Sequence, residues 1–143
     1  TEVENLRLLA EERKVGLRLA PLPDPPAMVR GNREKLVQLV DNLLLNAVKY
    51  NVENGEVLLE LARREQSVVL TVSDSGLGMA REHMANIFNR FYQANLTGTG
   101  RLEGLGIGLS LVQEIVLLHK GDISVQSEPG QGTTFTVILE SLP

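Results

Sequence analysis

The chain has 143 residues and a mass of 15.7 kDa, which fits one domain of ordinary size. With 43% hydrophobic and 22% charged residues it has a globular composition, and its apolar runs fall short of the roughly 18 residues that a membrane span needs. The absence of cysteine excludes disulfides and Cys-based metal clusters, and two histidines are too few for a His-based cluster. The net charge of -4 and the 3% of aromatic residues argue against nucleic-acid binding.

The N-terminal segment is charged throughout and has no apolar core of the kind that a signal peptide carries. Residues 1–14 are predicted to form a helix, because Val3, Leu6 and Ala10 recur at a spacing of three to four residues. Two interpretations stay open for this helix. It is either the end of a longer linker helix from a preceding domain or an ordinary first helix.

The remaining elements alternate between strand and helix patterns. Asn32 is predicted to cap a long helix that runs to about Tyr50, and Asn54 with Gly55 is predicted to form a turn. The other expected elements are strands at 15–21, 28–30, 57–63, 67–74, 122–127 and 133–140, helices at 80–93 and 105–120, and a glycine-rich loop at 95–104. This order predicts a helical layer on one face of a mostly antiparallel sheet, an α+β sandwich.

The long helix carries two asparagines inside an apolar run. Asn42 and Asn46 are four residues apart and therefore share a face, which Lys49 and Tyr50 extend. A solvated helix face is the structural alternative. Amide oxygens and an ammonium group suit a hard cation and a phosphate chain, so the stripe indicates a magnesium and phosphate site.

Residues 74–79, DSGLGM, follow a predicted strand. Asp74 leaves the strand into Gly76 and Gly78, which lack a Cβ and let backbone approach a ligand closely. A simple turn is the alternative. An ionised carboxylate here could accept a hydrogen bond from an exocyclic amine, which would favour adenine over guanine.

Residues 104–109, GLGIGL, lead directly into a helix. Unobstructed backbone amides at a helix N-terminus suit phosphate oxygens. The glycine spacing and the preceding loop differ from a dinucleotide-binding fingerprint, and no glycine-rich stretch ends in Lys-Ser or Lys-Thr as a P-loop does. The signatures of protein kinases are also missing.

Five motifs in order resemble those of the catalytic ATP-binding domain of sensor histidine kinases, in the GHKL ATPase superfamily that includes gyrase and heat-shock chaperones. They are NLLLNAVKY (N box), DSGLGM (first glycine box), IFNRFYQ (F box), GLGIGL (second glycine box) and GQGTTF (third glycine box). The resemblance covers nearly the whole chain from about Val15. It implies a two-layer sandwich in which about three helices cover one face of a mixed, mostly antiparallel sheet of about five strands. It also implies ATP and Mg²⁺ as cofactors.

The resemblance assigns roles to residues of the N box and the first glycine box. Asn46 matches the magnesium ligand, and Asn42 lines the same site. Lys49 and Tyr50 match contacts on the phosphate and ribose side. Asp74 matches the acceptor of the adenine amine, and the residues expected around the base are Gly76, Gly78, Met79 and Ile87.

Further roles fall in the second half of the chain. Tyr92 begins a lid at residues 93–104 that closes over the triphosphate, and its phosphate-side hinge consists of Gly104, Gly106, Ile107, Gly108 and Leu109. Phe135 is expected to pack beneath the nucleotide pocket. Many relatives carry arginine where this chain has Gln93, and Arg101 is the candidate to supply that charge to the γ-phosphate.

The two histidines, His83 and His119, lack the setting of a phosphoacceptor and are expected to be structural. The expected acceptor therefore lies on a separate dimerisation domain of the same parent protein, upstream of residues 1–14. A response regulator is the second expected partner. We expect a monomeric, cytoplasmic domain without direct membrane contact, whose parent protein could be membrane-anchored.

Two other functions stay open. Hydrolytic members of the superfamily carry a water-activating glutamate where this chain has Asn42, and the neighbouring Asp41 lies about 100° around the helix. Transfer to an imidazole needs no such base, because a ring nitrogen already has a lone pair. The other alternative is a non-catalytic, nucleotide-dependent interaction module. Gln93 favours this alternative, whereas the complete motifs argue against it.

Overall fold

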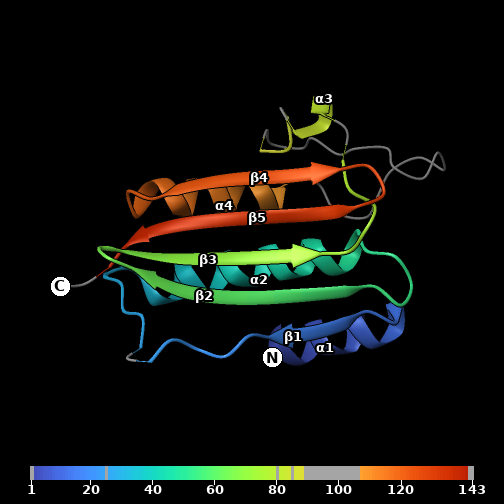
Figure 1. The fold of residues 1–143 in the computed structure, drawn as a ribbon, viewed down its shortest axis with the longest axis horizontal. Helices are drawn as coiled ribbons and strands as arrows, with labels where there is room; N and C mark the ends of the chain where they lie inside the picture. The colour runs from blue at the N-terminus through green and yellow to red at the C-terminus, as the bar shows by residue number, and fades with distance from the viewer. Residues whose placement is uncertain (1, 25, 80, 85, 89–106, 142–143) are drawn as a thin grey trace.

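A computed structural model describes residues 2–24, 26–79, 81–84, 86–88 and 107–141 (Figure 1). Its elements are α1 (Glu2–Arg13), β1 (Gly16–Leu19), α2 (Arg33–Lys49), β2 (Glu56–Arg64), β3 (Ser67–Asp74), α3 (Arg81–Met84), α4 (Ile107–Leu118), β4 (Asp122–Glu128) and β5 (Gly132–Glu140). None of the helices in these ranges has the length and apolar content needed to cross a membrane.

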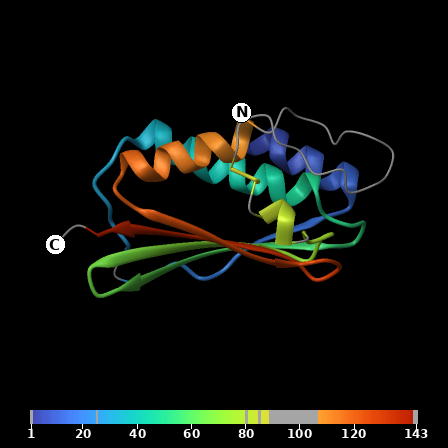
Figure 2. The ribbon, with the colours of Figure 1, turned by 90° about the horizontal axis from the view of Figure 1, so that it is seen from above.

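The strands form one five-stranded sheet in the order β1-β2-β3-β5-β4. The β1–β2 pair is parallel, and the other three pairs are antiparallel. Helices α1, α2 and α4 lie side by side on one face of the sheet, and the opposite face carries no helix in the described ranges (Figure 2). The predicted two-layer α+β sandwich is confirmed.

The core lies between the helical layer and the sheet. Along α2 the buried residues Leu39, Leu43 and Ala47 recur every four residues, so they form one stripe facing the sheet. They pack in one cluster with residues of α1, α4 and the central strands: Leu6, Ala10, Val112, Ile115, Val116, Leu70, Val72, Phe135 and Val137. This burial fixes both ends of α2 relative to the sheet.

The boundaries of α2 agree with the sequence prediction. The side chain of Asn32 accepts a hydrogen bond from the backbone N–H of Lys35 at 3.0 Å, which is the expected N-cap. The helix ends at Lys49, and Tyr50 is the C-cap.

Two predicted elements are wrong in extent. Residues 28–30 form no strand; Val29 makes only an isolated bridge to Ser141. The preceding prolines lack the N–H that a ladder requires, so pairing does not extend. Within the described residues, the predicted helix 80–93 is helical over Arg81–Met84, and residues 86–88 form a turn. Its residues 80, 85 and 89–93 lie outside the described ranges.

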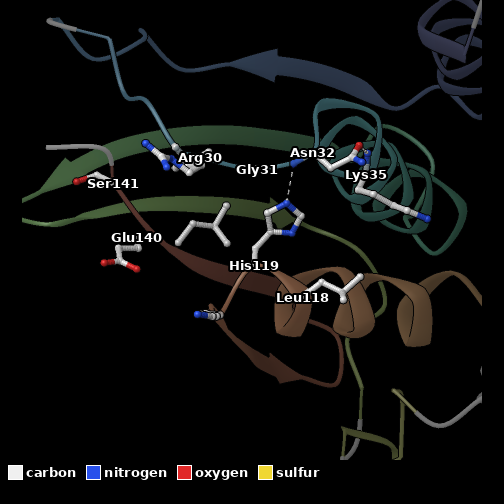
Figure 3. Close-up of a pocket in the computed structure, with 11 residues that line it drawn as sticks. Arg30, Gly31, Asn32, Lys35, Leu118, His119, Glu140 and Ser141 are labelled. Atoms are coloured by element: carbon white, nitrogen blue, oxygen red, sulfur yellow. Dashed lines mark hydrogen bonds between the residues drawn. The ribbon is translucent and has the colours of Figure 1, made fainter.

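His119 joins the end of α4 to the start of α2 (Figure 3). Its Nε2 accepts the backbone N–H of Asn32 at 3.1 Å, and because that N–H can only donate, Nδ1 carries the proton and donates to the carbonyl of Ile115 at 2.8 Å. A Cβ on Gly31 would lie 2.5 Å from Nε2, so glycine is needed for this contact. The geometry agrees with the expected structural role of His119.

Replacing His119 with alanine is therefore expected to lower the free energy of unfolding by about 1 to 2 kcal/mol, because it removes the hydrogen bond from Asn32 that joins the two helices and the bond to the carbonyl of Ile115. Urea unfolding measures the change. Glu114→Ala, at an exposed position of α4, is the control and should differ little from wild type. Equal losses in the two variants would contradict the role assigned to His119.

Candidate functional site

The polar stripe of α2 occupies its C-terminal half. Asn42, Asn46, Lys49 and Tyr50 are half-buried, whereas the neighbouring Leu43 is fully buried against the sheet. Among the residues that the structure describes, neither asparagine side chain has a hydrogen-bond partner. The stripe is therefore neither packed into the core nor fully solvated, and within the described residues its amide oxygens meet no competing donor.

Asp74 ends β3, where it pairs with Thr133 of β5. Its Oδ1 accepts the backbone N–H of Gly76 at 2.9 Å. Burial raises the pKa of the Asp74 carboxyl to about 6, against the lowering effect of the backbone N–H groups of Gly76 and Thr133. A partly desolvated carboxylate at the end of a strand is a typical feature of a binding site.

The glycines after Asp74 let the loop pack between two other parts of the chain. A Cβ on Gly76 would lie 2.6 Å from the carbonyl oxygen of Tyr50, at the end of α2. Gly78 has a φ of +70°, and a Cβ there would collide with the carbonyl of Glu128 in β4. Sequence reasoning attributed these glycines to ligand access, and the structure gives them a packing role inside the protein.

Backbone hydrogen bonds fix the same loop on both sides. The N–H of Leu77 donates to the carbonyl of Tyr50 at 3.2 Å, and the carbonyl of Leu77 accepts from Gly130 at 2.7 Å. The N–H of Met79 donates to Oγ of Ser127 at 2.8 Å. Ser127 could not be identified from local sequence, because its partner lies 48 residues away. Asp74 and the end of α2 therefore belong to one hydrogen-bonded unit.

Apolar residues lie behind this unit. Ile87 is 4% exposed and belongs to the hydrophobic core, and the half-buried Met79 packs against that core. Phe88 meets Phe135 edge-on, with ring centroids 6.3 Å apart. Phe135 is buried in the core, and its place beneath a nucleotide pocket stays a prediction.

The remaining site predictions fall on the start of α4 and on the segment before it. Gly108 and Leu109 lie in the first turn of α4, which begins at Ile107. The predicted lid at 93–104 and four of the predicted site residues lie outside the described residues: Tyr92, Arg101, Gly104 and Gly106. Their roles stay predictions.

The fold has counterparts among solved structures. A mycobacterial sensor histidine kinase, MprB, superimposes with a TM-score of 0.81 at 24% identity, covering 99% of this chain and 93% of that chain. Full-length ShkA, solved in complex with AMPPNP, gives a TM-score of 0.80 at 28% identity over 98% of this chain and 28% of that chain. The fold is therefore the α/β fold of histidine-kinase catalytic domains.

The sequence comparison defines the family. The chain belongs to the family described as "Histidine kinase-, DNA gyrase B-, and HSP90-like ATPase", whose model matches residues 31–143. Sensor histidine kinase RppB from Synechocystis sp. is 38% identical over 109 residues, which are 76% of this chain and 24% of that protein. The chain thus spans about a quarter of this relative's length. The resemblance drawn from the five motifs is confirmed.

Proposed function

We propose that the chain binds Mg-ATP and transfers its γ-phosphate to a histidine on a separate dimerisation domain. The observation that carries this proposal is the hydrogen-bonded unit that brings a partly desolvated carboxylate, Asp74, to the end of α2, whose C-terminal half carries Asn42 and Asn46. The names of the relatives, which are sensor histidine kinases, and the AMPPNP in the ShkA structure support it.

Adenine recognition falls to Asp74 in this proposal. Its carboxylate can accept only, so it selects a base that presents an amine at the facing edge. Guanine presents a carbonyl there, and two acceptors would meet without a proton between them. Although burial raises the pKa of Asp74 to about 6, this value lies below neutral pH, so the required ionised form still dominates there.

The residues of α2 fit a magnesium ion bound together with phosphates. In the described part of the chain, no group of three or more His, Cys, Asp or Glu side chains could hold a metal, so a cation would depend on a few protein oxygens together with phosphate and water. No described residue occupies the side-chain oxygen of Asn46 by a hydrogen bond, and Asn42 lies one turn away. When bound, Mg²⁺ neutralises phosphate charge. Lys49 would add a positive charge on the same helix face.

Transfer breaks the bond between the γ-phosphorus and the bridging oxygen, with ADP leaving, and forms a bond from phosphorus to an imidazole nitrogen. Because the nitrogen attacks through its lone pair, the chain needs to bind, orient and neutralise rather than remove a proton. This fits the presence of Asn42 at the position where hydrolytic members of the superfamily carry a water-activating glutamate. Asp41 is half-buried on another face of the helix and does not replace it.

The proposal also names partners and a location. The acceptor histidine would lie on a dimerisation domain of the same parent protein, and the phosphoryl group would pass to a response regulator. The chain itself would act as a monomeric domain in the cytoplasm, where ATP is available.

Incubation with γ-labelled ATP and a separate helical domain carrying an acceptor histidine tests the transfer. We expect label on that domain as an acid-labile, base-stable phosphoramidate. Release of inorganic phosphate without labelled protein would instead indicate a hydrolytic ATPase. Nucleotide binding with neither product would indicate an interaction module.

The pKa of Asp74 predicts a pH dependence of base recognition. Adenosine has no phosphate to titrate, so its affinity should fall as the pH drops through about 6, where the free carboxyl gains a proton. Calorimetry between pH 5 and 8 measures this, and Asp74→Asn should abolish the dependence. A flat profile in the wild type would contradict the use of Asp74 as an ionised acceptor.

A further inference from the structure

Two consecutive carbonyls, that of the last residue of α2 and that of its C-cap, accept hydrogen bonds from two different parts of the chain. A helix ends with carbonyls that lack partners within the helix. The carbonyl of Lys49 accepts a hydrogen bond from the guanidinium of Arg13, with Nη1 2.9 Å from the oxygen. The next carbonyl, of Tyr50, accepts from the N–H of Leu77 in the loop after Asp74. One peptide unit therefore separates a bond to α1 from a bond to the nucleotide site.

The Arg13 bond is favourable for two reasons. The guanidinium is charged, and hydrogen bonds from charged donors are stronger than those between neutral groups. It also meets the C-terminal end of α2, where the helix dipole attracts positive charge. The bond is partly buried, which limits competition from water.

The residues directly after α1 are hydrogen-bonded through their backbone to the turn that follows α2. The carbonyl of Lys14 accepts from the N–H of Asn54 at 2.8 Å, and the N–H of Gly16 donates to the carbonyl of Gly55 at 2.9 Å. Glu56, which follows Gly55, exchanges two hydrogen bonds with Ser75, next to Asp74. A second path thus runs from α1 to the loop that carries the carboxylate.

We propose that Arg13 is a positioning residue that couples the docking of α1 to nucleotide binding at the end of α2. The inference rests on the proposed function. Arg13 touches no ligand in this account; it fixes the peptide of Lys49 and thereby the orientation of Lys49 and Tyr50. Coupling is reciprocal, so bound nucleotide should also hold α1 more firmly on α2.

The test compares Arg13→Gln with Arg7→Gln, which removes the same side chain from an exposed position of the same helix. We expect Arg13→Gln to weaken Mg-ADP binding about tenfold in calorimetry, and Arg7→Gln to stay within about twofold of wild type. Arg13→Lys should recover part of the affinity, because its ammonium group can donate to the carbonyl with a positive charge, which the shorter, neutral amide of glutamine lacks.

Hydrogen exchange of α1 separates coupling from a loss of stability alone. Mg-ADP should slow exchange of α1 amides in the wild type and in Arg7→Gln, and should do so much less in Arg13→Gln. Wild-type affinity or wild-type protection of α1 in Arg13→Gln would overturn the inference. If Arg13→Gln fails to fold, Arg13→Lys and Arg13→Ala carry the test. Wild-type affinity for Mg-ADP and wild-type protection of α1 in both variants would overturn the inference, because alanine cannot donate a hydrogen bond. Failure of the wild type to bind Mg-ADP would count against the proposed function instead.

Discussion

Replacing Asn46 with alanine is expected to slow phosphoryl transfer to a histidine domain at least ~100-fold, because transfer depends on positioning and on neutralising charge around the γ-phosphate. Binding of ADP without magnesium should stay within a few-fold of wild type, since Asp74 lies on another element. Transfer from γ-labelled ATP and calorimetry with ADP measure the two effects separately.

A matched control for Asn46→Ala is Gln38→Ala. Gln38 also carries a side-chain amide on α2, but it is exposed and lies two turns before Asn46. Its replacement should leave transfer near the wild-type rate. Near-normal transfer in Asn46→Ala would remove the magnesium role from this helix and leave the paired asparagines as a packing feature.

Asp74→Asn is expected to weaken ATP binding about 10- to 100-fold, because it removes a charge-assisted hydrogen bond of roughly 1.5 to 3 kcal/mol. The unfolding free energy of the free protein should not fall in parallel. Since burial raises the pKa of Asp74 to about 6, this group contributes stability at low pH that is lost as the pH rises through about 6. At pH 7.5 a neutral asparagine avoids the cost of burying an ionised carboxylate, so Asp74→Asn should be at least as stable as wild type.

Asp122→Asn controls for the loss of a negative charge, because Asp122 is an exposed residue at the start of β4. It should change neither ATP affinity nor stability appreciably. Unchanged ATP affinity in Asp74→Asn would show that the adenine assignment is wrong. Weaker binding with a matching loss of stability would instead make Asp74 a structural residue.

The parts of the fold that sequence predicted well are those that local signals determine. Asn32 caps α2 by accepting a hydrogen bond from Lys35, only three residues further on, and the spacing of Leu39 and Leu43 directly indicates the buried face. The region after residue 80 was harder to predict. Ile87 and Phe88 do face inward, but they pack in a turn, because contacts with the core stabilise the segment without a continuous helix.

The site shows the same division. Its polar residues were visible as motifs, since Asn42 with Asn46 and Asp74 with Gly76 are close in sequence. The contacts that hold them were not visible, because they join distant residues: Arg13 bonds to Lys49, 36 positions away, and neither residue type signals the pairing. Long-range hydrogen bonds to backbone carbonyls leave no local pattern to read.

A structure of the chain with bound AMPPNP and Mg²⁺ tests the central claim most directly, because it locates the nucleotide. We predict the adenine amine within hydrogen-bond distance, about 3 Å, of the Asp74 carboxylate, and the metal next to the side-chain oxygen of Asn46. A nucleotide bound elsewhere, such as in the cavity of about 730 Å³ beside His119 at the opposite end of α2, would contradict it.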